Sequence, residues 1–145
     1  MRIIFFGYEE TDLCFRAWKL GYEVVFLPVN IIHYEHGSYS NNDVKKERRL
    51  VYFLESRRLY FIHKNYNAKF LLKKLPFVYY YFLGSMVMDI VKRKNTNLCL
   101  GRLKALLWFF TKIPEIIRKR MIKKNYIRSE NDLENLGLII SHKNR

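Results

Sequence analysis

The fold class that the sequence predicts is α/β over residues 1–43 and mainly α after them. Residues 1–43 alternate short β-prone runs with one helical pattern, whereas residues 44–124 hold longer stretches in which apolar and basic side chains follow helical spacing. Half of the 145 residues are hydrophobic, a composition that argues against a disordered chain. A chain of this length has room for about one domain.

The elements expected in the N-terminal part follow from its β-branched and aromatic runs and from its turn residues. In chain order they are a strand at Arg2–Tyr8, a helix at Leu13–Leu20, and strands at Tyr22–Leu27 and Val29–Tyr34. Asp12 is the expected N-cap of the helix, and Gly21 is the residue that ends it. A segment of this size buries too little surface to fold alone. We therefore interpret it as the closing edge of a larger α/β domain.

The rest of the chain divides into three predicted parts. Residues 44–74 form a basic helical segment, residues 75–124 form amphipathic helices that associate with a membrane, and residues 125–145 form a polar tail. Leu75–Val91 is the most hydrophobic stretch, although Pro76, Gly84 and Asp89 interrupt it. As a helix it would reach only ~26 Å, less than the ~30 Å of a bilayer core. We therefore expect an interfacial or re-entrant helix here.

Charge is distributed unevenly along the chain. The net charge is −3 over residues 1–43, +7 over residues 44–91, +10 over residues 92–124 and zero in the tail, within a total of +14. Such a basic body predicts an anionic partner, which is either a membrane surface or nucleic acid. Nucleic acid is disfavoured, because the basic residues are interleaved with apolar stripes and belong to no nucleic-acid-binding motif.

A helix predicted at Leu103–Met121 favours the membrane surface. Its apolar stripe comprises Leu103, Leu106, Leu107, Phe110, Ile113, Ile117 and Met121, surrounded by lysines and arginines. Pro114 either kinks this helix or begins a second one. A basic amphipathic helix of this kind binds anionic bilayers. The alternative is an ordinary helix that packs its stripe on a core.

The chain shows no features of a secreted protein. Its two cysteines, Cys14 and Cys99, lie in no metal-binding pattern, and free thiols fit a reducing compartment. The N-terminus lacks a signal-peptide core, because Glu9 and Glu10 follow a very short apolar run. We expect a peripheral location on the cytoplasmic face of the cell membrane.

Three carboxylates, Glu9, Glu10 and Asp12, lie together at the predicted helix start. The helix dipole favours ionised carboxylates at this position. An ionised carboxylate in a cleft accepts the proton of an attacking hydroxyl, which is general-base catalysis. Capping of the helix alone is the simpler interpretation of the cluster.

The order of motifs around this cluster carries a family resemblance. The motifs are Phe5-Phe6-Gly7-Tyr8-Glu9-Glu10-Thr11-Asp12-Leu13-Cys14-Phe15-Arg16, then Gly21-Tyr22, Pro28, His33 and Gly37-Ser38, and finally the basic segment Glu55–Tyr66. This order resembles the C-terminal part of the catalytic domain of family-2 glycosyltransferases, especially rhamnosyltransferase-like members. The resemblance covers roughly residues 3–66, with a looser likeness in the amphipathic tail.

The resemblance implies a GT-A fold, of which residues 1–43 would be the C-terminal part. It also implies a nucleotide-sugar donor, Mg²⁺ or Mn²⁺ as cofactor, and transfer with inversion to a glycan or lipid-linked acceptor of the cell surface. In this family the second acidic residue of the pair is the general base, which places that role on Glu10, with Glu9 as the second candidate. Many relatives carry Asp where this chain has Glu10.

Four further residues are candidates through the same resemblance. His33 matches a histidine that completes the metal site in some members, although a role as a strand-end or phosphate hydrogen-bonder stays open. Arg57 and Arg58 are expected to bind the donor diphosphate, unless they are solvated or lipid-facing charges. Asp12 is a candidate substrate-binding residue, but its spacing from Arg16 also predicts a salt bridge on one helix face.

The sequence contains no Asp-x-Asp pair, which the family uses to hold metal and diphosphate. We therefore expect a separate N-terminal nucleotide-binding segment as a partner, and we expect the chain to be inactive alone. The predicted function is the C-terminal part of an inverting glycosyltransferase. The alternative is a non-catalytic basic module that binds membranes or nucleic acid.

Overall fold

The computed structural model describes residues 7–25, 27–28, 30, 44–122 and 125–139. These residues form the helices α1 (Glu9–Lys19), α2 (Val44–Asn65), α3 (Ala68–Val91), α4 (Thr96–Met121) and α5 (Glu130–Asn135). Helix accounts for 77% of the described residues, and none of them belongs to a β-strand.

The predicted α/β edge of a GT-A domain is therefore wrong for the part of the chain that the structure describes. Tyr22–Val25, predicted as a strand, is exposed and irregular. Its β-branched and aromatic residues have strand propensity, but a strand persists only when a neighbouring strand pairs with its backbone. No described segment provides that pairing. The predicted strands at Arg2–Tyr8 and Val29–Tyr34 fall almost entirely outside the described residues.

The N-terminal helix is present but begins earlier than predicted. α1 starts at Glu9, and Tyr8 occupies the N-cap position, so Asp12 is not the cap. Gly21 ends the helix as predicted: it adopts a φ of +89°, and its backbone N–H donates to the carbonyl oxygen of Trp18 at 3.0 Å. Glycine is the residue that adopts this left-handed conformation without steric cost.

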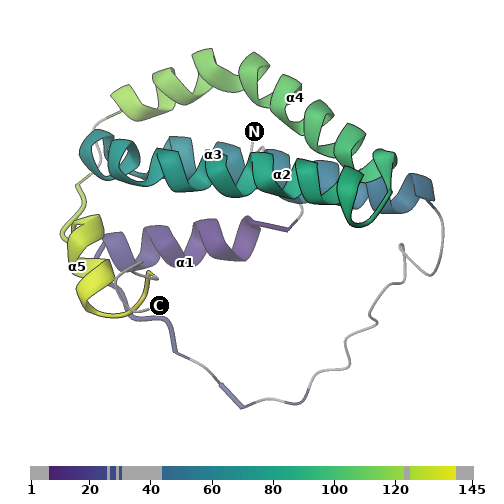
Figure 1. The fold of residues 1–145 in the computed structure, drawn as a ribbon. Coiled ribbons are helices and arrows are strands. Elements are labelled where there is room, and N and C mark those ends of the chain that lie inside the picture. Colours follow the sequence, from purple (N-terminus) through teal and green to yellow (C-terminus); the bar gives the residue numbers. More distant parts are fainter. Residues whose placement is uncertain (1–6, 26, 29, 31–43, 123–124, 140–145) are drawn as a thin grey trace.

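The helices are arranged in layers around α2. Figure 1 shows α1 on one side of α2 and α3, α4 curving over the opposite side, and α5 at one end. α2 and α4 run in the same direction, because their early residues Arg48 and Gly101 are close together and their late residues His63 and Arg120 are hydrogen-bonded. α3 connects them in sequence and runs in the opposite direction (Figure 1).

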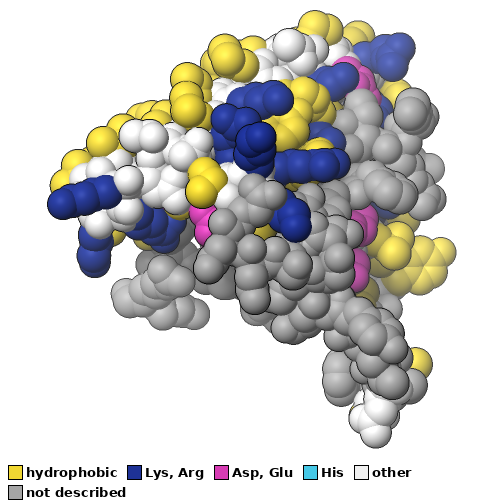
Figure 2. Space-filling view, turned by 90° about the vertical axis from the view of Figure 1, so that its right-hand side faces the viewer, with side chains coloured by type: hydrophobic (Ala, Val, Ile, Leu, Met, Phe, Trp, Pro, Cys, Tyr) yellow, Lys and Arg dark blue, Asp and Glu magenta, His cyan; other side chains and the backbone are white. Residues whose placement is uncertain are grey.

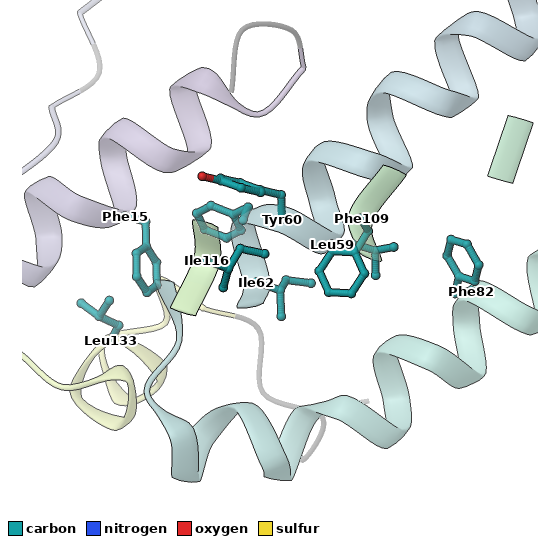
Figure 3. Close-up of a cluster of buried hydrophobic side chains, with 9 residues drawn as sticks. Phe15, Leu59, Tyr60, Ile62, Phe82, Phe109, Ile116 and Leu133 are labelled. Atoms are coloured by element: carbon teal, nitrogen blue, oxygen red, sulfur yellow. The ribbon is translucent and has the colours of Figure 1, made fainter. Parts of the chain in front are cut away.

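The core explains why α2 is central. Its buried members are Phe15 of α1, Leu59, Tyr60, Phe61 and Ile62 of α2, Phe82 of α3, Phe109 and Ile116 of α4, and Leu133 of α5 (Figure 3). Four consecutive residues of a helix point in all directions around its axis, since each turn contains 3.6 residues. Burial of four consecutive α2 residues therefore requires neighbours on every side.

The predicted basic helical segment is interrupted after α2. The side chain of Asn67 caps α3 by accepting a hydrogen bond from the backbone N–H of Phe70 at 2.8 Å. Arg120 donates to the carbonyl oxygens of His63 and Tyr66, each at 2.6 Å, at the end of α2. Side chains thus satisfy carbonyl groups at the end of α2 and a backbone N–H group at the start of α3. These hydrogen bonds stabilise the interruption between the two helices.

Helices α3 and α4 are longer than predicted. α3 continues through Pro76, and α4 contains the predicted helix Leu103–Met121, begins at Thr96 and continues past Pro114. A second helix was one of the two outcomes predicted at Pro114, and it does not occur, because α4 is a single helix through this residue. Among the described residues, no helix is long and apolar enough to cross a membrane.

A buried ion-pair cluster joins the three long helices. Arg102 of α4 forms ion pairs with Glu55 of α2 and with Asp89 of α3, the latter at 2.8 Å. Asp89 is fully buried and also pairs with Arg93 at 2.9 Å. A buried carboxylate without a partner would cost several kcal/mol, so each helix position depends on the other two.

Two helical glycines provide a matched test of the packing of α2 on α4. A Cβ atom at Gly101 would lie 2.7 Å from the carbonyl oxygen of Arg48, whereas a Cβ at Gly84 would meet no atom within 4 Å. We expect Gly101→Ala to lower the free energy of unfolding by about 1–3 kcal/mol through overpacking. Gly84→Ala should raise it by roughly 0.5–1 kcal/mol through helix propensity. Urea denaturation of both variants checks this, and a stabilised Gly101→Ala would contradict the close approach.

Candidate functional site

The three carboxylates of α1 lie in different environments. Glu9 accepts a hydrogen bond from the backbone N–H of Tyr8 at 3.0 Å, so it serves the helix start. Glu10 is exposed, and no described residue donates a hydrogen bond or an ion pair to it. Asp12 is buried with 8% of its surface exposed. Of the three, Glu10 is the carboxylate that an incoming hydroxyl group reaches without displacing a partner.

Asp12 is held by residues from two helices. Lys64 Nζ and Asn65 Nδ2 of α2 both lie 2.6 Å from its Oδ1 atom, and Arg16 Nε of α1 lies 3.0 Å from Oδ2. The predicted Asp12–Arg16 salt bridge is thus confirmed. The contact with α2 could not be predicted from local spacing, because 52 positions separate Asp12 from Lys64.

Opposing effects act on the pKa values of Asp12 and Lys64. Burial alone raises the pKa of the Asp12 carboxyl, but hydrogen bonds from Lys64 and Asn65, together with the charges of Lys64 and Arg16, hold it below its usual range. Burial lowers the pKa of Lys64, although Asp12 opposes that effect. The lowered pKa of Asp12 adds stability above the ordinary carboxyl pKa, and this stability is lost as the pH falls through the folded value.

A second buried pair lies at the other end of α1. Lys19 Nζ lies 3.0 Å from Glu130 Oε1, and both side chains are almost fully buried. Glu130 also accepts a hydrogen bond from the backbone N–H of Asn67 at 2.9 Å. This carboxylate therefore connects α1, α5 and the start of α3. This pair cannot be predicted from the sequence, because no local pattern relates residues so far apart in the chain.

The two candidate diphosphate ligands of α2 are in different places. Arg57 faces α4, where its guanidinium lies 4.3 Å from the centre of the Trp108 ring. Burial lowers the pKa of Arg57, and its Nε and Nη1 atoms have no hydrogen-bond partner among the described residues. Arg58 forms an ion pair with Glu55 at 2.5 Å and lies close enough to Tyr8 to affect its pKa. Only Arg58 is therefore close to the start of α1.

The predicted metal ligand His33 lies outside the described residues. Within the described ranges, no group of three His, Cys, Asp or Glu side chains could hold a metal ion.

Comparisons with known proteins add no relative. No family model, curated protein or solved structure matches this chain.

A matched pair of amide substitutions tests the different environments of the α1 carboxylates. We expect Asp12→Asn to lower the free energy of unfolding by roughly 3 kcal/mol, because it leaves Lys64 buried without a counter-charge. Glu10→Gln, at an exposed position, should change it by less than about 0.5 kcal/mol. Chemical denaturation at neutral pH measures both. Equal effects of the two substitutions would show that Asp12 does not fix α1 on α2.

Proposed function

We propose that this chain is the acceptor-side, membrane-associating part of an inverting glycosyltransferase. The observation that carries the catalytic half is Glu10 at the start of α1, which is exposed and has no hydrogen-bond or ion-pair partner among the described residues. The nearby Asp12 instead pairs with Lys64 and Arg16 and accepts a hydrogen bond from Asn65. Glu10 is the residue to which the family resemblance assigns the base. In this proposal a nucleotide-binding segment, supplied by preceding polypeptide or another subunit, holds the nucleotide-sugar donor with Mg²⁺ or Mn²⁺.

The proposed reaction is a single displacement. The Glu10 carboxylate accepts the proton of the acceptor hydroxyl while that oxygen forms a bond to the anomeric carbon. The bond from this carbon to the diphosphate breaks at the same time, and its electron pair leaves with the nucleoside diphosphate. Attack opposite the leaving group inverts the anomeric configuration.

The role of Glu10 is tested in an enzyme reconstituted with its nucleotide-binding part. Glu10→Gln keeps the shape of the side chain but cannot accept the proton, so kcat should fall by about 10²–10⁴-fold with little change in donor affinity. Glu9→Gln is the matched control, since its carboxylate serves the helix start. Should Glu9→Gln lose the turnover while Glu10→Gln keeps more than about a tenth of it, Glu9 is the base.

The outer face of α4 supports the membrane half of the proposal. Its inner face is buried through Ala105, Phe109 and Ile116. Leu106 of the predicted apolar stripe packs against the core, but most of the stripe points away from the bundle. The outward-facing side chains Leu103, Leu107, Phe110, Ile117 and Met121 are 42–80% exposed. An exposed apolar stripe of this length is typical of a surface that binds a partner or a membrane. The alternative, in which the stripe packs on the protein's own core, does not hold for these five side chains.

Basic residues complete this surface at one end of the bundle. Figure 2 shows lysine and arginine side chains gathered beside apolar ones on the face that contains the start of α2 and the α3–α4 turn. The basic residues of these two segments are Lys45, Lys46, Arg48, Arg49, Lys92, Arg93 and Lys94. Positive charge beside apolar side chains complements an anionic bilayer, where phosphate headgroups overlie acyl chains.

Vesicle binding tests this surface. We expect the chain to sediment with phosphatidylglycerol vesicles at low salt and to be released at high salt, because screening weakens surface electrostatics. Phe110→Ser should weaken binding about tenfold or more through lost apolar burial. Ile127→Ser removes an apolar side chain outside α4 that is more exposed than Phe110, 78% against 53%, and should leave binding unchanged.

Two results would contradict the membrane half. One is no binding to phosphatidylglycerol vesicles at low salt. The other is tighter, salt-dependent binding to a generic DNA duplex, which would favour the non-catalytic nucleic-acid-binding alternative. Vesicle binding with no loss of turnover in Glu10→Gln or Glu9→Gln would instead favour a non-catalytic membrane module.

A further inference from the structure

A cleft between α2 and α3 combines apolar walls with an arginine. It has a volume of about 220 Å³. Ile62 of α2 and Val78 and Tyr81 of α3 supply apolar lining, while Arg58 and Lys74 supply the charges. Clefts that take a whole drug-sized ligand measure about 300–1,000 Å³. This cleft therefore fits a small group or the end of a longer molecule, and not a complete nucleotide sugar.

Arg58 is the cation in this cleft that retains hydrogen-bonding capacity. Lys74 Nζ already pairs with Glu134 at 2.8 Å. The Nε atom of Arg58 is buried and has no hydrogen-bond acceptor among the described residues, whereas its Nη2 atom lies 2.5 Å from Glu55 Oε2. Its ion-pair partner Glu55 is shared with Arg102. Arginine donors that lack acceptors in a partly apolar site favour a carboxylate or phosphate ligand.

The apolar wall continues out of the cleft along α3. No residue between Leu75 and Met88 is charged. Tyr81, at the cleft, is 48% exposed, and the neighbouring Tyr80 is 72% exposed. A ligand whose anionic group binds Arg58 therefore meets a continuous apolar surface as it leaves the cleft. An amphiphile with one anionic end has this distribution of polarity.

We propose that the α2–α3 cleft binds the phosphate group and the first carbons of a lipid phosphate, with Arg58 as the phosphate ligand. The identification of this lipid as the acceptor carrier rests on the proposed function. The binding site itself rests on the cleft. Arg58 lies near Tyr8, so the proposed phosphate position is close to the start of α1, where Glu10 is exposed.

Calorimetric titration of the full chain with three probes tests the site. Octyl phosphate, used below its critical micelle concentration, has both an anionic phosphate group and an alkyl chain. Octanol lacks the anionic group, and inorganic phosphate lacks the alkyl chain. We expect octyl phosphate to bind at least about tenfold more tightly than either of the others, since charge-assisted hydrogen bonds and apolar burial both contribute. Equal affinity of inorganic phosphate would reveal a simple anion site, and equal affinity of octanol a purely apolar one. Either result overturns the proposal.

Two variants and one control locate the site. Arg58→Gln should weaken octyl phosphate binding about tenfold and leave octanol binding unchanged. Arg118→Gln makes the same charge change at an exposed position of α4 and should have no effect. If Arg58→Gln fails to fold, Tyr81→Ser at the half-exposed cleft wall should weaken both octyl probes and spare inorganic phosphate. Equal binding by these variants and the control overturns the proposal, while the vesicle and turnover experiments remain independent of it.

Discussion

The buried ion-pair cluster around Arg102 is the constraint on which the bundle depends. A single guanidinium from α4 satisfies carboxylates from α2 and α3, and one of these, Asp89, has no access to water. Removing Arg102 would leave each of these two carboxylates with one arginine partner, Arg58 for Glu55 and Arg93 for Asp89, and would remove the charge that joins the three helices. The apolar core alone allows helices to slide against one another, because dispersion contacts are not directional. The ion pairs fix the relative positions of the three long helices, and Gly101 permits the approach that they require.

The fixed positions of the three long helices place two candidate functional surfaces on different sides of α2. One side of α2 binds α1 through Asp12 and Lys64 and leaves Glu10 exposed. The other side binds the inner face of α4, and most of the apolar stripe of that helix therefore faces outward. A candidate catalytic carboxylate and a candidate membrane-binding face are thus attached to opposite sides of the same central helix (Figure 1). This arrangement leaves each accessible while the other is engaged.

Local patterns predicted what local forces determine. Gly21 ended a helix as expected, and the 3.6-residue period identified the helix around Phe110, because both depend on residues within a few positions. The strand expected at Tyr22–Val25 failed, since strand formation depends on a partner that composition does not reveal. Asp89 interrupts an apolar stretch of the sequence, yet its ion pair with the distant Arg102 allows it to be fully buried. Glu10 and Asp12 are neighbours in the sequence and look alike there. Contacts with α2 distinguish them, because α2 buries Asp12 and leaves Glu10 exposed.

The attachment of α1 also has a consequence for local unfolding. α4 packs along α2 over much of its length, whereas α1 makes few backbone contacts with the bundle. Two buried ion pairs, Asp12–Lys64 and Lys19–Glu130, hold α1 in place. A segment held by few contacts opens with a lower free energy than the rest of a structure. We therefore expect α1, which bears the acidic residues, to detach from the bundle before α2 and α4 separate.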